Sequence, residues 1–207
     1  MLFLHKAALP HMQNRFSISS IQLVALAMAT GLFRAFNHDA GPVQILPMLS
    51  PMLAILVFAN ANFTRLQAAL LGLAALLVSD LLMMKLYYSQ YASGFLYEGW
   101  YLNYALLLLF GLSGGLLRTK MSVPRIGGVL VSSAFGYWLL SNLITFFSGT
   151  DMTSGKPFEL SVAGLAKCYT LALPFLSHYV AGALLYGTLL FGASYQMVKK
   201  NAWQVVR

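Results

Sequence analysis

Long apolar runs separated by short polar segments dominate the chain. A helix needs about 20 mostly apolar residues to cross the hydrocarbon core of a bilayer. The pattern predicts six such helices, at residues 19–36, 46–63, 66–84, 101–117, 126–148 and 179–198. The predicted fold class is therefore an all-α integral membrane protein with six transmembrane helices.

The apolar segment at residues 160–173 is harder to assign. It is short, carries Lys167 and stops at Pro174. Treated as a full span it gives seven spans, and treated as a half-helix it gives six. We expect an outer half-helix or re-entrant segment, which is tolerated when its ends are buried in protein or face water.

The distribution of basic residues favours six spans with both termini in the cytoplasm. In that topology the inner side holds Lys6, Arg15, Arg65, Arg118, Lys120, Arg125, Lys199, Lys200 and Arg207. The outer side holds only Arg34, Lys85, Lys156 and Lys167. An excess of Lys and Arg in cytoplasmic loops is the usual arrangement in membrane proteins. The chain then divides into an N-terminal arm (1–18), a membrane domain (19–198) and a basic cytoplasmic tail (199–207).

The composition agrees with a membrane setting. Hydrophobic residues make up 59% of the chain and charged residues 9%, against about 25% charged residues in ordinary soluble domains. Such a chain cannot build a water-facing surface, so its solvent is lipid. The basic residues are scattered at the ends of apolar runs, which argues against nucleic acid as a partner.

Polar residues in and beside the predicted spans gather toward their outer ends. Asp80 is the most informative, because a carboxylate within a membrane span is costly unless it faces protein, water or a partner. The pattern predicts a pocket that opens to the outside, with these candidate residues: Arg34, Asp80, Asn103, Tyr104, Asn142, Lys167, His178 and Tyr179. An interfacial position alone would explain Arg34, Asn103 and Tyr104. Asp80 could equally pair with Arg34 or Lys167 as a structural tie.

The motifs of common enzymes and pumps are absent from the sequence. It has no phosphate-binding GxxxxGK[ST] loop, no HExxH and no GxSxG. The single cysteine, Cys168, rules out a CxxC-type metal site, and no second His or Cys stands at ligand spacing, so the sequence argues against a zinc site. We expect no enzymatic activity, no cofactor and no metal.

Small residues at helical spacing mark faces on which helices can approach closely. They occur as Ala25 and Ala29, as Gly111 and Gly115, and as the series Gly128, Ser132 and Gly136. These faces serve either internal packing or the docking of a separate membrane subunit, and the sequence leaves both open.

Several short stretches between about residues 20 and 197 together resemble a known family. They are Leu49-Ser50-Pro51, Leu77-Val78-Ser79-Asp80-Leu81-Leu82, Ser141-Asn142-Leu143, Ala163-Gly164-Leu165, Cys168-Tyr169, Leu173-Pro174-Phe175 and Leu190-Phe191-Gly192. The family consists of uncharacterised bacterial membrane proteins and is similar to the substrate-binding S-components of energy-coupling factor (ECF) vitamin transporters.

The resemblance implies a six-helix protein of the bacterial inner membrane with a ligand pocket near its outer face. It implies capture of a small micronutrient, such as a vitamin or cofactor precursor, with loops 37–44 and 85–100 as lids. Uptake would need a membrane coupling subunit, docked on Ala25 and Ala29, and two ATPases. The chain lacks the family's usual Asn-Phe-Thr-Pro entry to the second span, and its only Asn-Phe-Thr begins at Asn62. An accessory, non-transporting subunit of a larger membrane complex is the alternative, and a small intramembrane enzyme ranks below both.

Overall fold

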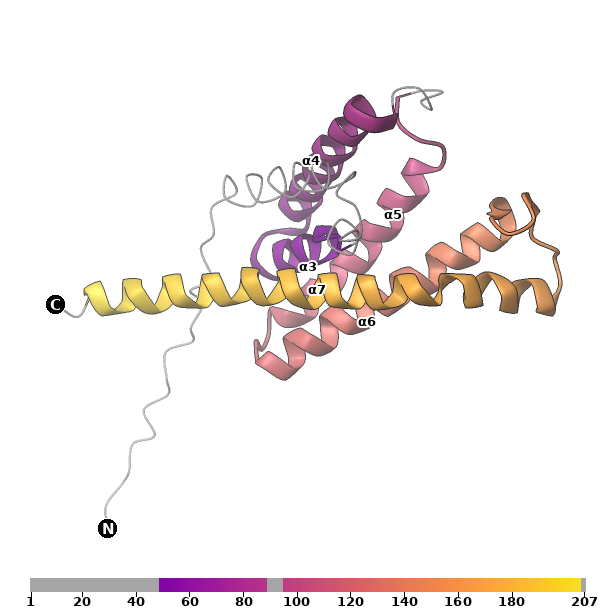
Figure 1. Cartoon of the computed structure of the whole chain (residues 1–207). Coiled ribbons are helices and arrows are strands. Elements are labelled where there is room, and N and C mark those ends of the chain that lie inside the picture. The colour runs from indigo at the N-terminus through magenta and orange to yellow at the C-terminus, as the bar shows by residue number, and fades with distance from the viewer. Residues whose placement is uncertain (1–48, 89–94, 206–207) are drawn as a thin grey trace, which may run out of the picture.

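The computed structural model describes residues 49–88 and 95–205 (Figure 1). The elements in chain order are α3 (Met52–Asn62), α4 (Arg65–Met83), the π-helical turn η2 (Met84–Tyr88), α5 (Trp100–Gly111), the 3-10 helix η4 (Leu112–Leu117), α6 (Val123–Ser148), strands β1 (Thr150–Asp151) and β2 (Lys156–Pro157), and α7 (Val162–Val205). The predicted first span, its Ala25 and Ala29, and Arg34 lie outside the described residues.

Among the described residues, four helical segments are long and apolar enough to cross a membrane. They are Arg65–Leu86, Trp100–Leu117, Val123–Ser148 and Val162–Tyr195. The first three coincide with predicted spans to within a few residues. Helix α6 begins before the predicted residue 126 because Pro124 fits in a first helical turn, where no backbone N–H is needed. The chain is therefore a multi-pass, all-α membrane protein.

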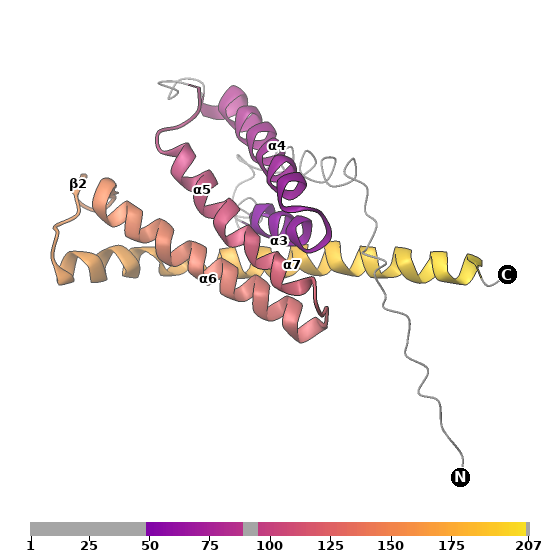
Figure 2. The same ribbon diagram turned by 180° about the vertical axis from the view of Figure 1, so that it is seen from behind.

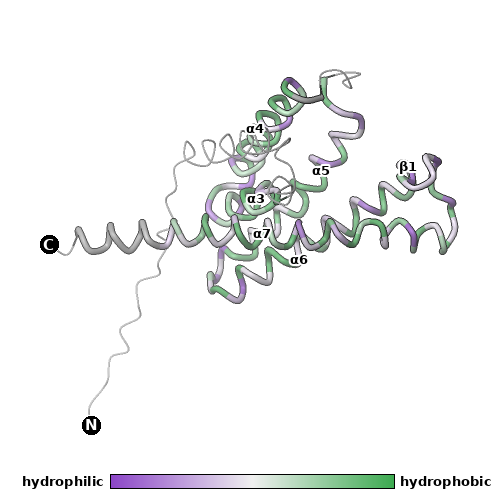
Figure 3. Tube along the Cα trace, viewed as in Figure 1, coloured by the Kyte–Doolittle hydropathy of each residue, from purple (hydrophilic) through white to green (hydrophobic). Residues whose placement is uncertain are grey.

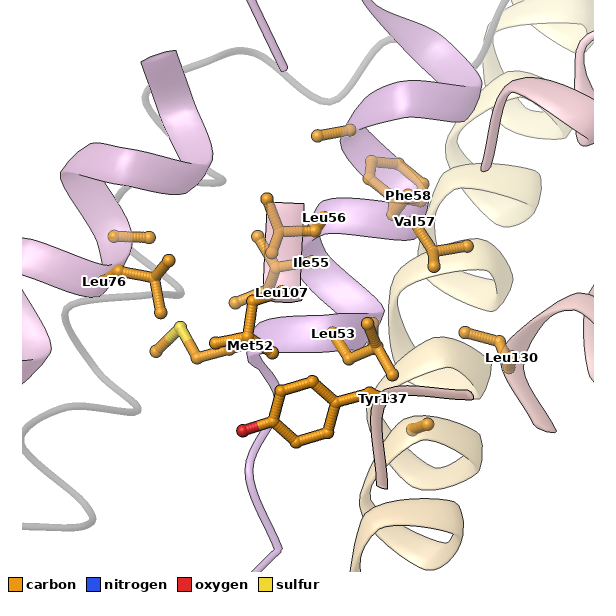
Figure 4. Close-up of a cluster of buried hydrophobic side chains, with 14 of the residues drawn as sticks. Met52, Leu53, Ile55, Leu56, Val57, Phe58, Leu76, Leu107, Leu130 and Tyr137 are labelled. Carbon is orange, nitrogen blue, oxygen red and sulfur yellow. The ribbon is translucent and has the colours of Figure 1, made fainter. Parts of the chain in front are cut away.

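The helices form two antiparallel pairs that meet at α3. Figures 1 and 2 show α4 beside α5 and α6 beside α7, with α3 lying where the pairs meet. All 11 residues of α3 are buried, and it appears largely hydrophobic in Figure 3. Its side chains, among them Leu53, Leu56 and Phe58, form much of the cluster in Figure 4. Helix α3 is thus the core of the described bundle.

Helix α3 is shorter than the span predicted at residues 46–63. Residues 49–51 are not helical, and the helix starts only after Pro51. A residue that precedes a proline is pushed toward extended backbone, so Ser50 is a poor helical residue. Eleven residues extend about 17 Å, roughly half the hydrocarbon thickness. This helix by itself does not span, so only four of the six predicted spans have a helix long enough to cross a membrane among the described residues.

Glycines on neighbouring elements let those elements approach α3 closely. A Cβ added at Gly114 in η4 would lie 1.9 Å from the carbonyl oxygen of Val57, and one at Gly111 would lie 2.6 Å from Leu56 Cβ. A Cβ at Gly115 would meet nothing within 4 Å. The close approach therefore uses Gly111 and Gly114, rather than the predicted pair Gly111 and Gly115.

The predicted half-helix at residues 160–173 is wrong, because α7 runs without a break from Val162 to Val205 through Pro174. Contacts with α6 hold the chain straight on the N-terminal side of the proline. Tyr169 Oη donates to the Leu139 carbonyl oxygen at 2.8 Å, and Trp138 Nε1 donates to that of Ala172 at 2.9 Å. Membrane helices tolerate proline where neighbouring helices support the weakened turn.

Candidate functional site

A cavity of about 350 Å³ opens beside α3, where α4 ends and α5 begins. We call this side of the bundle, with the ends of α4 and α6 and the starts of α5 and α7, the cavity end. The cavity is lined by Ser50, Met52, Leu53, Leu76, Asp80, Tyr97, Asn103, Leu107, Tyr137, Phe175, His178 and Tyr179. Small-molecule sites begin at about this size and combine apolar walls with a few polar groups.

Asp80 supplies the carboxylate of the cavity. It sits in the last turn of α4 and is 8% exposed. Tyr104 of α5 donates its hydroxyl to Asp80 Oδ2 at 2.9 Å, and the Tyr104 ring packs edge-on against Trp100, with centroids 5.2 Å apart. A hydrogen bond to a buried carboxylate offsets part of its desolvation. Tyr104 thereby fixes the orientation of Asp80.

Asn103 joins two tyrosines across the cavity wall. Its Nδ2 donates to Tyr97 Oη at 2.7 Å, and its Oδ1 accepts from Tyr137 Oη at 2.5 Å. In Figure 4 the Tyr137 ring lies beside Met52 and Leu53 at the edge of the buried cluster. Because both ends of the amide are used, the three side chains hold one another in place.

Helix α7 contributes the opposite wall through Phe175, His178 and Tyr179. His178 Nδ1 lies 2.8 Å from the carbonyl oxygen of Pro174. A carbonyl can only accept, so His178 Nδ1 carries a proton and donates it to Pro174. The ring of Tyr179 packs edge-on against Tyr137 with centroids 5.1 Å apart.

The structure brings some of the sequence-predicted site residues together. Asp80, Asn103, His178 and Tyr179 line the cavity, and Tyr104 lies behind Asp80. They come from α4, α5 and α7, so the tertiary fold collects them.

Two predicted site residues lie elsewhere. Asn142 Nδ2 donates to the Trp138 carbonyl oxygen one turn earlier on α6, at 2.7 Å. Lys167 pairs with Asp151 at 2.5 Å rather than with Asp80, so the suggested tie between Asp80 and Lys167 is wrong. Neither residue lines the cavity.

Sequence reasoning missed Tyr137 and Ser50 as cavity residues, and placed Tyr97 only in a lid loop. The available signal for Tyr137 was its phenol in the middle of an apolar span, since a buried tyrosine hydroxyl usually needs a partner. Ser50 and Tyr97 come from segments outside the long helices, and no periodic pattern marks such residues.

The pair Lys167 and Asp151 closes a small hairpin instead of serving the cavity. The predicted polar loop 149–159 contains β1 and β2, which pair with Asp151 opposite Lys156. Hydrogen bonds from Lys167, and next from Thr153, hold the pKa of the Asp151 carboxyl well below its usual range. A lowered folded-state pKa means that the ionised carboxylate stabilises the fold at pH values above about 4, and that this contribution is lost as the pH falls below it.

We therefore expect the hairpin to loosen in acid. The titration midpoint of Asp151, followed by the ¹³C shift of its carboxyl in detergent micelles, should lie below about 3.9, the usual value. Lys167→Gln removes the largest cause of the shift and should raise the midpoint. An identical midpoint in Lys167→Gln would contradict the role given to this pair.

The groups in the cavity wall are suited to binding a small molecule. Among the described residues, no three His, Cys, Asp or Glu side chains are grouped so as to hold a metal ion. The wall offers a carboxylate, an amide, an imidazole, phenol hydroxyls and aromatic faces beside apolar side chains. Such a set can orient a small polar or aromatic molecule by hydrogen bonds and stacking.

Comparison with known proteins yields one match. A family model described as a family of unknown function (DUF6580) matches residues 13–205. No curated protein and no solved structure matches the chain. The match covers nearly the whole sequence, including all cavity residues, so the chain belongs to the DUF6580 family of unknown function.

Proposed function

We propose that this protein is a membrane-embedded substrate-binding subunit, similar to the S-components of ECF transporters, that captures a small micronutrient. A vitamin or a cofactor precursor is the class of ligand. The observation that carries the proposal is the cavity. Polar and aromatic side chains from α4, α5, α6 and α7 converge on a space of about 350 Å³ at one end of the bundle.

The arrangement of the cavity wall supports a preformed site. The hydrogen bonds Tyr104–Asp80, Tyr97–Asn103 and Tyr137–Asn103 fix polar groups that would otherwise rotate. A ligand that meets fixed groups loses less free energy to ordering them. A merely structural polar cluster would have no need of an adjoining cavity.

The charge pattern supports a cavity that faces outward. The end of the bundle opposite the cavity holds Arg65, Arg118, Lys120 and Arg125, which favours a cytoplasmic location for that end. We place the protein in the bacterial inner membrane, with the cavity end outside and the C-terminus in the cytoplasm. The ligand would then enter from outside the cell.

A binding subunit of this kind needs partners to move its ligand. The chain has no nucleotide-binding motif, so separate ATPases and a membrane coupling subunit would drive uptake, with Ala25 and Ala29 as the proposed docking pair. The test is affinity purification of the tagged chain in mild detergent, followed by mass spectrometry of the proteins that co-purify. We expect a coupling subunit and ATPases to co-purify with the wild-type protein. Both should still co-purify with the Asp80→Asn variant. Neither should co-purify with the double variant Ala25→Leu/Ala29→Leu.

One observation favours the accessory-subunit alternative. The C-terminal part of α7 projects past the other described helices (Figures 1 and 2). A helix that projects in this way could bind a second membrane protein. Under this alternative the same purification would yield a stoichiometric membrane complex without ATPases and without a small molecule. That result would contradict the transport proposal.

A further inference from the structure

A second cavity lies at the end of the bundle opposite the first. It is a groove of about 420 Å³ between the start of α6 and the second half of α7. We call it the α6–α7 groove. Its walls are mainly apolar and include Met121, Ile126, Gly127, Leu184, Phe191 and Gly192.

Two of its glycines border open space in the described part of the chain. A Cβ added at Gly127 or at Gly192 would meet no atom of the described residues within 4 Å. A Cβ at Gly187, by contrast, would lie 2.3 Å from Leu130 Cδ1, so that glycine serves helix packing. An apolar groove on the side of a membrane helix pair is filled by lipid or by another apolar segment.

Basic residues stand next to two of the groove's lining residues in the chain. Lys120 precedes Met121 in the chain and is exposed, and Arg125 precedes Ile126 and donates to the Leu116 carbonyl oxygen at 2.8 Å. Arg118, nearby in the chain, donates to the Asn60 and Phe63 carbonyl oxygens at 2.8 and 2.7 Å, at the end of α3.

Acidic side chains lie at the other end. The four acids in the described residues, Asp80, Glu98, Asp151 and Glu159, all belong to the cavity end. The end with the groove therefore presents positive charge to its surroundings, and it suits an anion.

We propose that the α6–α7 groove binds one acyl chain of an anionic phospholipid, with Lys120 and Arg125 contacting the headgroup phosphate. Basic pockets beside membrane helices on the cytoplasmic side recognise anionic headgroups. A transmembrane helix about 10–12 Å wide would fill a volume of this size within about one turn, whereas an alkyl chain fits along it. A free phosphate ion would gain nothing from the apolar walls.

The experiment measures thermal unfolding of the purified full chain in detergent by tryptophan fluorescence. The probes are phosphatidylglycerol, phosphatidylcholine and inorganic phosphate at equal concentrations. A ligand at ten times its dissociation constant should raise Tm by about 3–6 °C. We expect this rise with phosphatidylglycerol, a smaller rise with phosphatidylcholine and none with phosphate.

Matched variants locate the effect. Gly127→Leu fills the groove and should reduce the phosphatidylglycerol rise by at least about half. Gly128→Leu is the control, because Gly128 is the next residue on α6, is exposed and does not line the groove. Lys120→Gln should remove the preference for phosphatidylglycerol over phosphatidylcholine.

Three results would overturn the proposal: equal rises with both lipids, a phosphate effect equal to the lipid effect, or an unchanged rise in Gly127→Leu. If Gly127→Leu does not fold, Gly192→Leu fills the groove from α7 and is judged by the same criterion. Native mass spectrometry of the wild-type protein gives an independent reading. Failure to retain phosphatidylglycerol in preference to phosphatidylcholine would also overturn the proposal.

Discussion

Gly114→Ala should destabilise the protein by about 3 kcal/mol, because the new methyl group would overlap the backbone of α3. Its Cβ would lie 1.9 Å from the Val57 carbonyl oxygen and 2.8 Å from the carbonyl carbon. No rotamer change relieves a clash with backbone, so η4 and α3 must separate. The measurement is the free energy of unfolding in mixed detergent and denaturing micelles.

Gly115→Ala is the matched control for this prediction. It adds the same methyl group to the same 3-10 helix, but at a position where nothing lies within 4 Å. Its stability should stay within about 0.5 kcal/mol of the wild type, with any change favourable, because alanine loses less backbone entropy than glycine. Equal stability of the two variants would mean that η4 does not pack closely on α3.

The second large effect is expected at Asp80. Asp80→Asn keeps the shape of the side chain but removes its charge, and hydrogen bonds to charged groups contribute about 1.5–3 kcal/mol. We expect the affinity for the captured molecule to fall about 10- to 100-fold. The readout is the amount of small molecule released from purified protein on denaturation, quantified by mass spectrometry against the wild type.

Asn142→Ala is the control that distinguishes a loss of ligand binding at the cavity from a general effect of removing a polar residue from a spanning helix. Asn142 is polar and lies in a spanning helix, but its amide bonds to its own helix at Trp138 and it does not line the cavity. Ligand content should therefore be unchanged in Asn142→Ala. A loss in both variants, or in neither, would remove Asp80 from the proposed site.

Hydropathy predicted three of the spanning helices well, because their length is imposed by the bilayer rather than by details of packing. It could not predict that α3 is short and wholly buried, since a core helix and a spanning helix are equally apolar. The prediction that the helix ends before Pro174 failed for a related reason. Proline ends most helices in water, but in α7 hydrogen bonds between Tyr169, Ala172 and α6 keep the helix intact beside it.

The candidate site was predictable where the sequence shows a polar residue against an apolar background. Asp80 stands out in this way, and Asn103, His178 and Tyr179 were found from their depth along the spans. Depth along the membrane does not tell which way a helix face points. For that reason Asn142 and Lys167 were included although they lie elsewhere, while Tyr137 was missed.

The unbroken course of α7 has a mechanical consequence. Its 44 residues extend about 66 Å and carry both cavity residues such as His178 and, farther along, the wall of the α6–α7 groove. A continuous helix acts as a stiff lever. A tilt of about 5° around His178 would displace Val205 by about 3.5 Å, since roughly 40 Å of helix separates them. A tilt of α7 caused at the cavity would thus displace its C-terminal end without any rearrangement in between.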